Sequence, residues 1–152
     1  MPSHDPALTI RPAAEPDAAA LAPLLAALGY PASADAVAAR LRRVAAYRGP
    51  VVALVAAAGD GSLVGLLTAH AFATVHADEP AALLTTLVVA PEARGRGVGR
   101  ALVRAAEAWA VTQGAVKVSV TSGAQRADAH RFYEGLGYAY TGKRFARTLS
   151  SK

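Results

Sequence analysis

Cysteine is absent from this 152-residue sequence. Without it the protein can form no disulfide bond and no zinc–thiolate site, and it cannot use a cysteine nucleophile. The composition fits a reducing compartment, and we expect a cytoplasmic location. The sequence opens without a basic stretch followed by an apolar run, so we expect no signal peptide.

Aromatic residues and long apolar runs are also scarce. Only 6% of the residues are aromatic, although 53% are hydrophobic. The core must therefore consist mainly of Leu, Val and Ala, and the alanine-rich stretches favour helices. No run approaches 18 apolar residues, so we expect no membrane-spanning helix. The length suits one domain, which we predict over residues 1–152 with its core at about 8–149.

Acidic residues are outnumbered. The chain has 16 Lys and Arg against 11 Asp and Glu, which gives a formal net charge of +5. This excess favours an anionic partner. Charge alone leaves nucleic acid, a phosphorylated cofactor and an anionic surface open.

The apolar periodicity and the turn residues predict the order β, α, α, β, β, β, α, β, α, β. Strands are expected at Leu8–Arg11, Val51–Ala57, Leu63–Ala73, Ala81–Val89 and Val116–Thr121, with one or two more within Tyr138–Leu149. Helices are expected at Pro16–Leu28, between Ser33 and Gly49, at Gly97–Gln113, and from about Ala129 to Gly137. This order indicates an α+β fold or an α/β sandwich, with helices covering a sheet.

The segment Leu87–Leu102 carries the strongest functional signal, because an apolar strand runs into a glycine-rich turn that opens a helix. The glycines are Gly95, Gly97 and Gly99, and the arginines are Arg94, Arg96 and Arg100. The first N–H groups of a helix have no partner within it and form an anion site. Glycine lets a phosphate approach the backbone closely. The turn therefore suits a pyrophosphate, while the simpler interpretation is a surface loop rich in Gly and Arg.

Two familiar nucleotide-binding motifs do not match this turn. It has no Gly-Lys-Ser/Thr ending, so it is not a P-loop. The third glycine of the dinucleotide fingerprint would fall at Arg100, and no acidic residue follows at the required distance to hold a ribose. A phosphate site of another kind remains.

At this point the sequence resembles the GNAT superfamily of acetyl-CoA-dependent N-acetyltransferases. That family's signature is Arg or Gln, two residues, Gly, one residue, then Gly or Ala, and it is matched by Arg94, Gly97 and Gly99. A second motif, Ala, then Phe-Tyr, then Gly-Phe/Tyr, is matched by Ala129, Phe132-Tyr133 and Gly137-Tyr138. The opening Ile10-Arg11-Pro12 and the turn Leu28–Pro31 are also similar to bacterial members.

The resemblance implies a GNAT-like α/β sandwich: a mixed, mostly antiparallel sheet with helices on both faces, and acetyl-CoA in the cleft where the central strands splay. It implies a cofactor-binding set of Leu87, Val88, Val89, Arg94, Gly95, Arg96, Gly97, Val98, Gly99, Arg100 and Arg126. A backbone N–H near Val88 or Val89 would polarise the thioester carbonyl. Tyr133 resembles the general acid that protonates the departing thiolate, although its position also fits an apolar helix stripe.

The sequence departs from the family in two places. Arg126 stands where the family often has Asn, and it would contact the phosphates or lie in solvent. The strand Ala81–Ala90 contains no carboxylate, although many members carry their general base there. The candidate replacements are His70, His76, Asp78, Glu79 and His130. Direct attack by a neutral amine needs no dedicated base.

Three functions follow from these observations. The leading hypothesis is an N-acetyltransferase that moves acetyl from acetyl-CoA to a primary amine by direct attack, without an acyl-enzyme. The second is an acyl-CoA sensor without turnover, and the third is a nucleic-acid-binding protein. The leading hypothesis expects a small amine-bearing acceptor, no metal, no nucleic acid and no membrane. A homodimer is expected by analogy alone.

Overall fold

The computed structural model describes residues 7–121, 127–142 and 144–150. Contacts divide the chain into two compact units, Met1–Val120 and Thr121–Lys152. Each unit is described separately below. In the described ranges, no helix is both long and apolar enough to cross a membrane.

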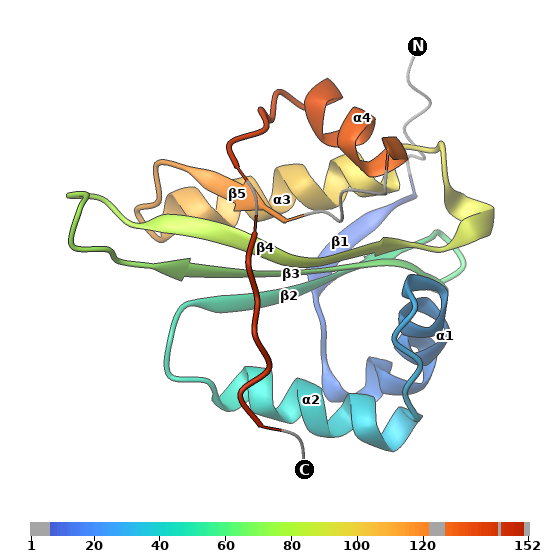
Figure 1. Ribbon diagram of the computed structural model, residues 1–152. Helices are drawn as coiled ribbons and strands as arrows, with labels where there is room; N and C mark the ends of the chain where they lie inside the picture. The colour runs from blue at the N-terminus through green and yellow to red at the C-terminus, as the bar shows by residue number, and fades with distance from the viewer. Residues whose placement is uncertain (1–6, 122–126, 143, 151–152) are drawn as a thin grey trace. The chain divides into compact units, whose positions relative to one another are not determined.

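The first unit is built on a five-stranded sheet whose spatial order follows the chain (Figure 1). The strands are β1 (Thr9–Pro12), β2 (Val51–Ala57), β3 (Leu63–Phe72), β4 (Ala81–Val89) and β5 (Val118–Val120). The first three pairings are antiparallel, and β4 pairs with β5 in parallel. A hairpin turn at residues 58–62 connects β2 to β3, whereas a helix connects β4 to β5, as parallel strands require. The predicted mixed, mostly antiparallel sheet is confirmed.

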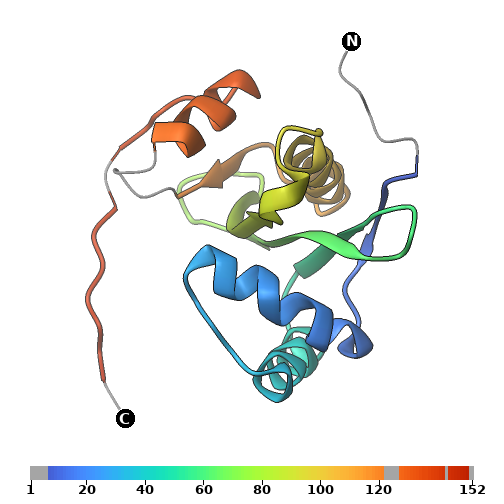
Figure 2. The ribbon, with the colours of Figure 1, turned by 90° about the vertical axis from the view of Figure 1, so that its right-hand side faces the viewer.

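Helices cover both faces of this sheet. They are α1 (Ala18–Leu28), α2 (Ala34–Ala46) and α3 (Val98–Thr112), together with the short 3-10 turns η1 (Glu15–Asp17) and η2 (Pro91–Ala93). Figure 2 shows α1 and α2 on one side of the sheet and α3 on the other. The predicted helix start after Ser33 is confirmed, because the Ser33 hydroxyl accepts the N–H of Ala36 at 3.1 Å.

The face of α3 that periodicity predicts is the face that packs on the sheet. Its residues Leu102, Val103, Ala106 and Ala110 are all buried. Gly65 of β3 lies directly beneath this helix, since a Cβ at that position would stand 2.8 Å from the Leu102 side chain and 3.0 Å from Val98. The absence of a side chain at Gly65 therefore lets α3 approach β3 closely.

Several element boundaries differ from the sequence prediction by a residue or two. The first strand extends through Pro12, which sits on the edge strand where a missing N–H is tolerated. The first α-helix begins at Ala18, after the 3-10 turn of η1, and β5 is shorter than Val116–Thr121. None of these differences changes the topology.

The second unit contains α4 (Ala127–Gly135), which confirms the predicted short helix, although it ends two residues before Gly137. The strands predicted within Tyr138–Leu149 are wrong for the described part of that segment, which has no helix or strand. Tyr140, Phe145 and Leu149 are 75%, 91% and 91% exposed there. A strand needs a partner edge for its backbone hydrogen bonds, which a short segment cannot supply by itself.

Candidate functional site

Strand β4 is longer than its parallel neighbour β5. Its pairing with β5 covers only Ala82–Leu84, opposite Val118–Val120. On its other side β4 stays paired with β3 as far as Val89. Among the described residues, the β5-side edge of β4 from residue 85 to residue 89 therefore has no strand partner. This edge offers backbone donors and acceptors to an extended ligand.

The register determines which amides lie on that free edge. The N–H of Ala90 donates to the carbonyl of Val64 at 2.8 Å. In an antiparallel pair every second N–H points to the partner strand, so the N–H of Val88 also points to β3. The N–H groups of Leu87 and Val89 consequently point away from β3, toward the free edge. The N–H of Val88 points toward β3, and its side chain is buried. Of the two amides named in the sequence analysis, Val89 is on the free edge.

A β-bulge marks the start of the free edge. The β3–β4 register shifts between Thr68, which pairs with Thr86, and Ala69, which pairs with Leu84, so Thr85 is the extra residue. The Thr85 and Thr68 hydroxyl oxygens are 2.7 Å apart, and the Thr85 hydroxyl also donates to the Thr68 carbonyl at 3.3 Å. A bulge bends its strand and re-aims the side chains around it.

The turn that follows β4 depends on glycine. After η2, Gly95 and Gly97 have φ values of 78° and 81°, a left-handed conformation that side chains disfavour. A Cβ on either glycine would meet no atom within 4 Å, so the space in front of the turn is open. The buried side chains of Ala93 and Val98 anchor the two ends of the turn.

The N-terminus of α3 has free amides at this turn. The first hydrogen bond of the helix runs from the N–H of Ala101 to the carbonyl of Gly97, so the N–H groups of Val98, Gly99 and Arg100 have no partner in a preceding helical turn. The helix dipole adds positive potential there.

Three arginines surround the same turn: Arg94, Arg96 and Arg100 are all exposed. In the described part of the chain, none of the three forms a salt bridge with a carboxylate. The structure therefore brings the predicted loop residues and the free edge of β4 together in one place.

Two other predicted site residues do not belong to the first unit. Tyr133 is in the second unit, half-buried on α4, with its ring centroid 5.1 Å from that of Phe132 and 5.8 Å from that of Tyr138. This contact supports its packing role and does not test its catalytic one. Arg126 lies outside the described residues.

The candidate bases differ in their surroundings. His76, Asp78 and Glu79 are exposed in the loop between β3 and β4. His130 is half-buried on α4 in the second unit. His70 lies within β3, is half-buried, and meets the ring of Tyr47 edge-on at 5.9 Å between centroids. In the described residues, no group of three or more His, Asp or Glu side chains could hold a metal ion.

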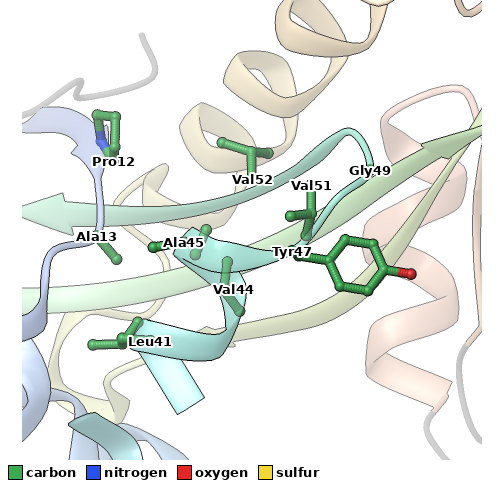
Figure 3. A pocket seen from close by; sticks show the side chains of 10 residues that line it. Pro12, Ala13, Leu41, Val44, Ala45, Tyr47, Gly49, Val51 and Val52 are labelled. Carbon is green, nitrogen blue, oxygen red and sulfur yellow. The ribbon is translucent and has the colours of Figure 1, made fainter. Parts of the chain in front are cut away.

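A pocket of about 250 Å³ is lined by residues of α2 and β2 and by Tyr47, whose ring contacts His70. Its lining consists of Pro12, Ala13, Leu41, Val44, Ala45, Tyr47, Gly49, Val51, Val52 and Ala53. Figure 3 shows Pro12 and Ala13 at one end of this pocket and the Tyr47 ring at the other. Two lining residues pair across strands with polar positions of β3, Val51 with His70 and Ala53 with Thr68.

Sequence reasoning missed the Thr68–Thr85 contact and the Tyr47–His70 contact. The pair Thr85-Thr86 inside an otherwise apolar strand was a usable signal, because it interrupts a run that is buried elsewhere. The Tyr47 contact left no such signal, since it joins residues that only the fold brings together.

The chain is similar to known acetyltransferases. The model of the "Acetyltransferase (GNAT) family" matches residues 24–138. Aminoglycoside N(6')-acetyltransferase type 1 from Stenotrophomonas maltophilia is 32% identical over 136 residues, which cover 88% of this chain and 87% of that protein. Aminoalkylphosphonate N-acetyltransferase from Salmonella typhimurium is 33% identical over 90 residues, and the match spans 59% of this chain and only 58% of that relative.

The fold is also found among solved structures. A GNAT family acetyltransferase from Staphylococcus aureus has a TM-score of 0.79 at 19% identity, over 93% of this chain and 98% of that one. At this identity the likeness establishes the fold.

Proposed function

The chain belongs to the GNAT acetyltransferase family and is an N-acetyltransferase by that membership, and we propose that it transfers acetyl from acetyl-CoA to a primary amine by direct attack. The observation that carries the cofactor proposal is the meeting of two features: the free edge of β4 leads, through the turn at residues 90–97, to the free N-terminus of α3. An acyl-CoA has a matching pair of parts, an extended pantetheine arm and a pyrophosphate.

The pyrophosphate would bind the amides of Gly95 to Arg100 and the side chains of Arg94, Arg96 and Arg100. This assignment rests on the open space at the turn and on the exposure of the three arginines. Charge-assisted hydrogen bonds of this kind are stronger than neutral ones. Arg126 is proposed as a further phosphate contact from the sequence alone.

The pantetheine arm would pair along the free edge of β4 like an added strand. Leu87 and Val89 would supply the backbone N–H groups, because the register turns their amides toward that edge. One of these N–H groups would donate to the thioester carbonyl and stabilise the negative charge that develops on its oxygen during attack. The side chain of Val88 would support the edge from the buried side.

Tyr133 is proposed as the general acid that protonates the departing CoA thiolate. The amine nitrogen forms a bond to the carbonyl carbon, the carbon–sulfur bond breaks, and the thiolate takes the phenolic proton. The proton that the nitrogen loses returns to the Tyr133 oxygen through water. An acyl-enzyme on cysteine is ruled out because the sequence has none. We propose one functional domain over residues 1–152.

An acyl-CoA sensor without turnover is the second candidate, because β4 carries no carboxylate to act as base. The two candidates share the cofactor site and differ in chemistry. They are separated by whether any amine accelerates release of CoA thiol.

The test has two parts. Calorimetry should show binding of CoA and much weaker binding of pantetheine, which lacks the pyrophosphate. Dephospho-CoA should bind more weakly than CoA only if the protein also contacts the adenosine phosphate. A thiol-release assay should then be run over a panel of amines that includes aminoalkylphosphonates and aminoglycosides, the acceptors in the names of two relatives. Equal affinity for CoA and pantetheine would contradict the phosphate site. CoA binding without turnover on any amine would favour the sensor.

A further inference from the structure

The polar side chains of the central sheet gather at one place. Strands β2, β3 and β4 are apolar throughout, except for Thr68 and His70 on β3 and Thr85 and Thr86 on β4. The register places Thr86 directly opposite Thr68, with Thr85 bulged beside it, and His70 lies two residues further along β3. Polar groups are expensive to keep in a sheet interior, so a cluster of them in one spot needs a reason.

All members of this cluster lie on the face that carries α1 and α2. Gly65 faces α3, and side chains alternate along a strand, so Thr68 and His70 point to the opposite face. This part of the sheet is only partly covered, since Thr85 is exposed and His70 is half-buried. The cluster therefore forms an open polar floor. Its neighbours on β2, Val51 opposite His70 and Ala53 opposite Thr68, belong to the lining of the pocket described above.

The polar floor borders the proposed thioester position. Thr86 immediately precedes Leu87, whose amide lies on the free edge of β4. On the other side, His70 is separated from Thr68 by two residues, or about 7 Å along an extended strand. A small amine placed over Thr68 and Thr85 would thus lie between the free edge of β4 and the His70 imidazole.

We propose that this floor binds the acceptor amine and that His70 is the general base that deprotonates it. The proposal deepens the function proposed above and rests on it. It assigns the acceptor site to Thr68, His70, Thr85 and the adjoining pocket. The acceptor class that fits is a small amine whose body is apolar or uncharged beside the reacting nitrogen, because β2, β3 and β4 contain no carboxylate to bind a second cationic group.

The proton balance is as follows. The acceptor arrives as an ammonium ion and transfers one proton to a ring nitrogen of His70, which leaves a neutral amine with a free lone pair. The amine attacks the thioester carbonyl. As the carbon–sulfur bond breaks, the thiolate takes the Tyr133 proton, and the second proton from nitrogen replaces it on the phenol. The His70 proton passes to water, so one ammonium and one thioester yield one amide, one thiol and one proton.

The contacts of His70 that the structure describes are aromatic and apolar. The ring of Tyr47 contacts it edge-on at 85° between the ring planes. Its cross-strand partners, Val51 and Leu83, are apolar. The charged residues nearest to Tyr47 in the chain are Arg43, in the last turn of α2, and Arg48. Any titration in the activity profile must therefore be assigned by variants of His70 and of Tyr47.

The experiment begins with the best amine found for the wild-type protein. His70→Gln should lower kcat/KM about 10²–10⁴-fold, the usual contribution of a general base, and should remove the acid-side inflection from the pH profile. CoA affinity measured by calorimetry should not change. His76→Gln tests the rival candidate base in the neighbouring loop, and a loss of rate there with none in His70→Gln would overturn the assignment of the base to His70. Tyr47→Phe should keep the inflection.

A second variant distinguishes the loss of a general base from the loss of the folded structure. His70→Ala should bind CoA normally and recover activity when imidazole is added, which a purely structural role would not allow. If His70→Gln keeps the wild-type rate and inflection, or imidazole rescues nothing in a folded His70→Ala, the base assignment is wrong while the acetyltransferase function stands. If the wild-type protein turns over no amine, the proposed function fails and this inference fails with it.

Discussion

The phosphate site is tested most sharply at Gly97, the residue that precedes α3. Its φ of 81° and the open space around a Cβ there mean that a short side chain would fit but would be held in a left-handed conformation. Asp and Asn both tolerate that conformation better than other residues do. They have nearly the same shape, so Gly97→Asp and Gly97→Asn differ essentially by one negative charge.

The size of the charge effect follows from the position. A carboxylate at residue 97 would stand about 4 Å from the proposed pyrophosphate, where two like charges repel by about 1 kcal/mol in water and about 4 kcal/mol at the effective dielectric of a protein surface. Since 1.4 kcal/mol is a factor of ten, Gly97→Asp should bind CoA roughly 5-fold to 700-fold more weakly than Gly97→Asn. The backbone strain, about 1 kcal/mol, should lower the Tm of both variants by about 2–4 °C.

The assay is calorimetric titration of CoA into both variants at 0.1 M and 1 M salt. The difference between the variants should shrink at 1 M salt, because the screening length falls from about 10 Å to about 3 Å. Pantetheine, which lacks the pyrophosphate, should not distinguish the two proteins. Equal CoA affinity for folded Gly97→Asp and Gly97→Asn would refute the placement of the pyrophosphate at this turn.

Three further predictions concern other parts of the molecule. Tyr133→Phe should lower the catalytic rate about 10²–10⁴-fold in a steady-state assay with little change in CoA affinity, and a fully active variant would remove the general-acid role. Gly65→Ala should lower the free energy of unfolding by about 1–3 kcal/mol in urea titrations, because its Cβ would stand 2.8 Å from the Leu102 side chain. An unchanged urea midpoint would contradict the close packing of α3 on β3. Arg11 donates two hydrogen bonds to the Asp17 carboxylate and thereby lowers the pKa of Asp17. The pair therefore stabilises the fold above the unfolded-state pKa of about 3.9. This contribution is lost as the pH falls through the lower folded-state pKa. The stability difference between wild type and Asp17→Asn should therefore be larger at pH 6 than at pH 3, and an equal difference at both would show that the carboxylate charge does not matter.

Local signals in the sequence were sufficient to predict most of the secondary structure and the glycine-rich turn. Gly95 and Gly97 adopt left-handed backbone conformations that glycine alone adopts easily, and the residues on either side repeat as a strand and a helix should. The buried face of α3 also followed from spacing alone, since the 3.6-residue period places Leu102, Val103 and Ala106 on one side. These features depend on residues close together in the chain, which is why the sequence by itself determined them.

The tertiary structure decided the features that depend on pairing between distant segments. The register of β3 on β4 turns the amides of Leu87 and Val89 outward, and the bulge at Thr85 brings its hydroxyl to 2.7 Å from that of Thr68. Neither follows from local pattern, because a shift of one residue in register reverses every side chain and amide without altering the sequence. For the same reason the one or two strands predicted within Tyr138–Leu149 were wrong for the described part of that segment, because an extended segment becomes a strand only where a partner edge pairs with it.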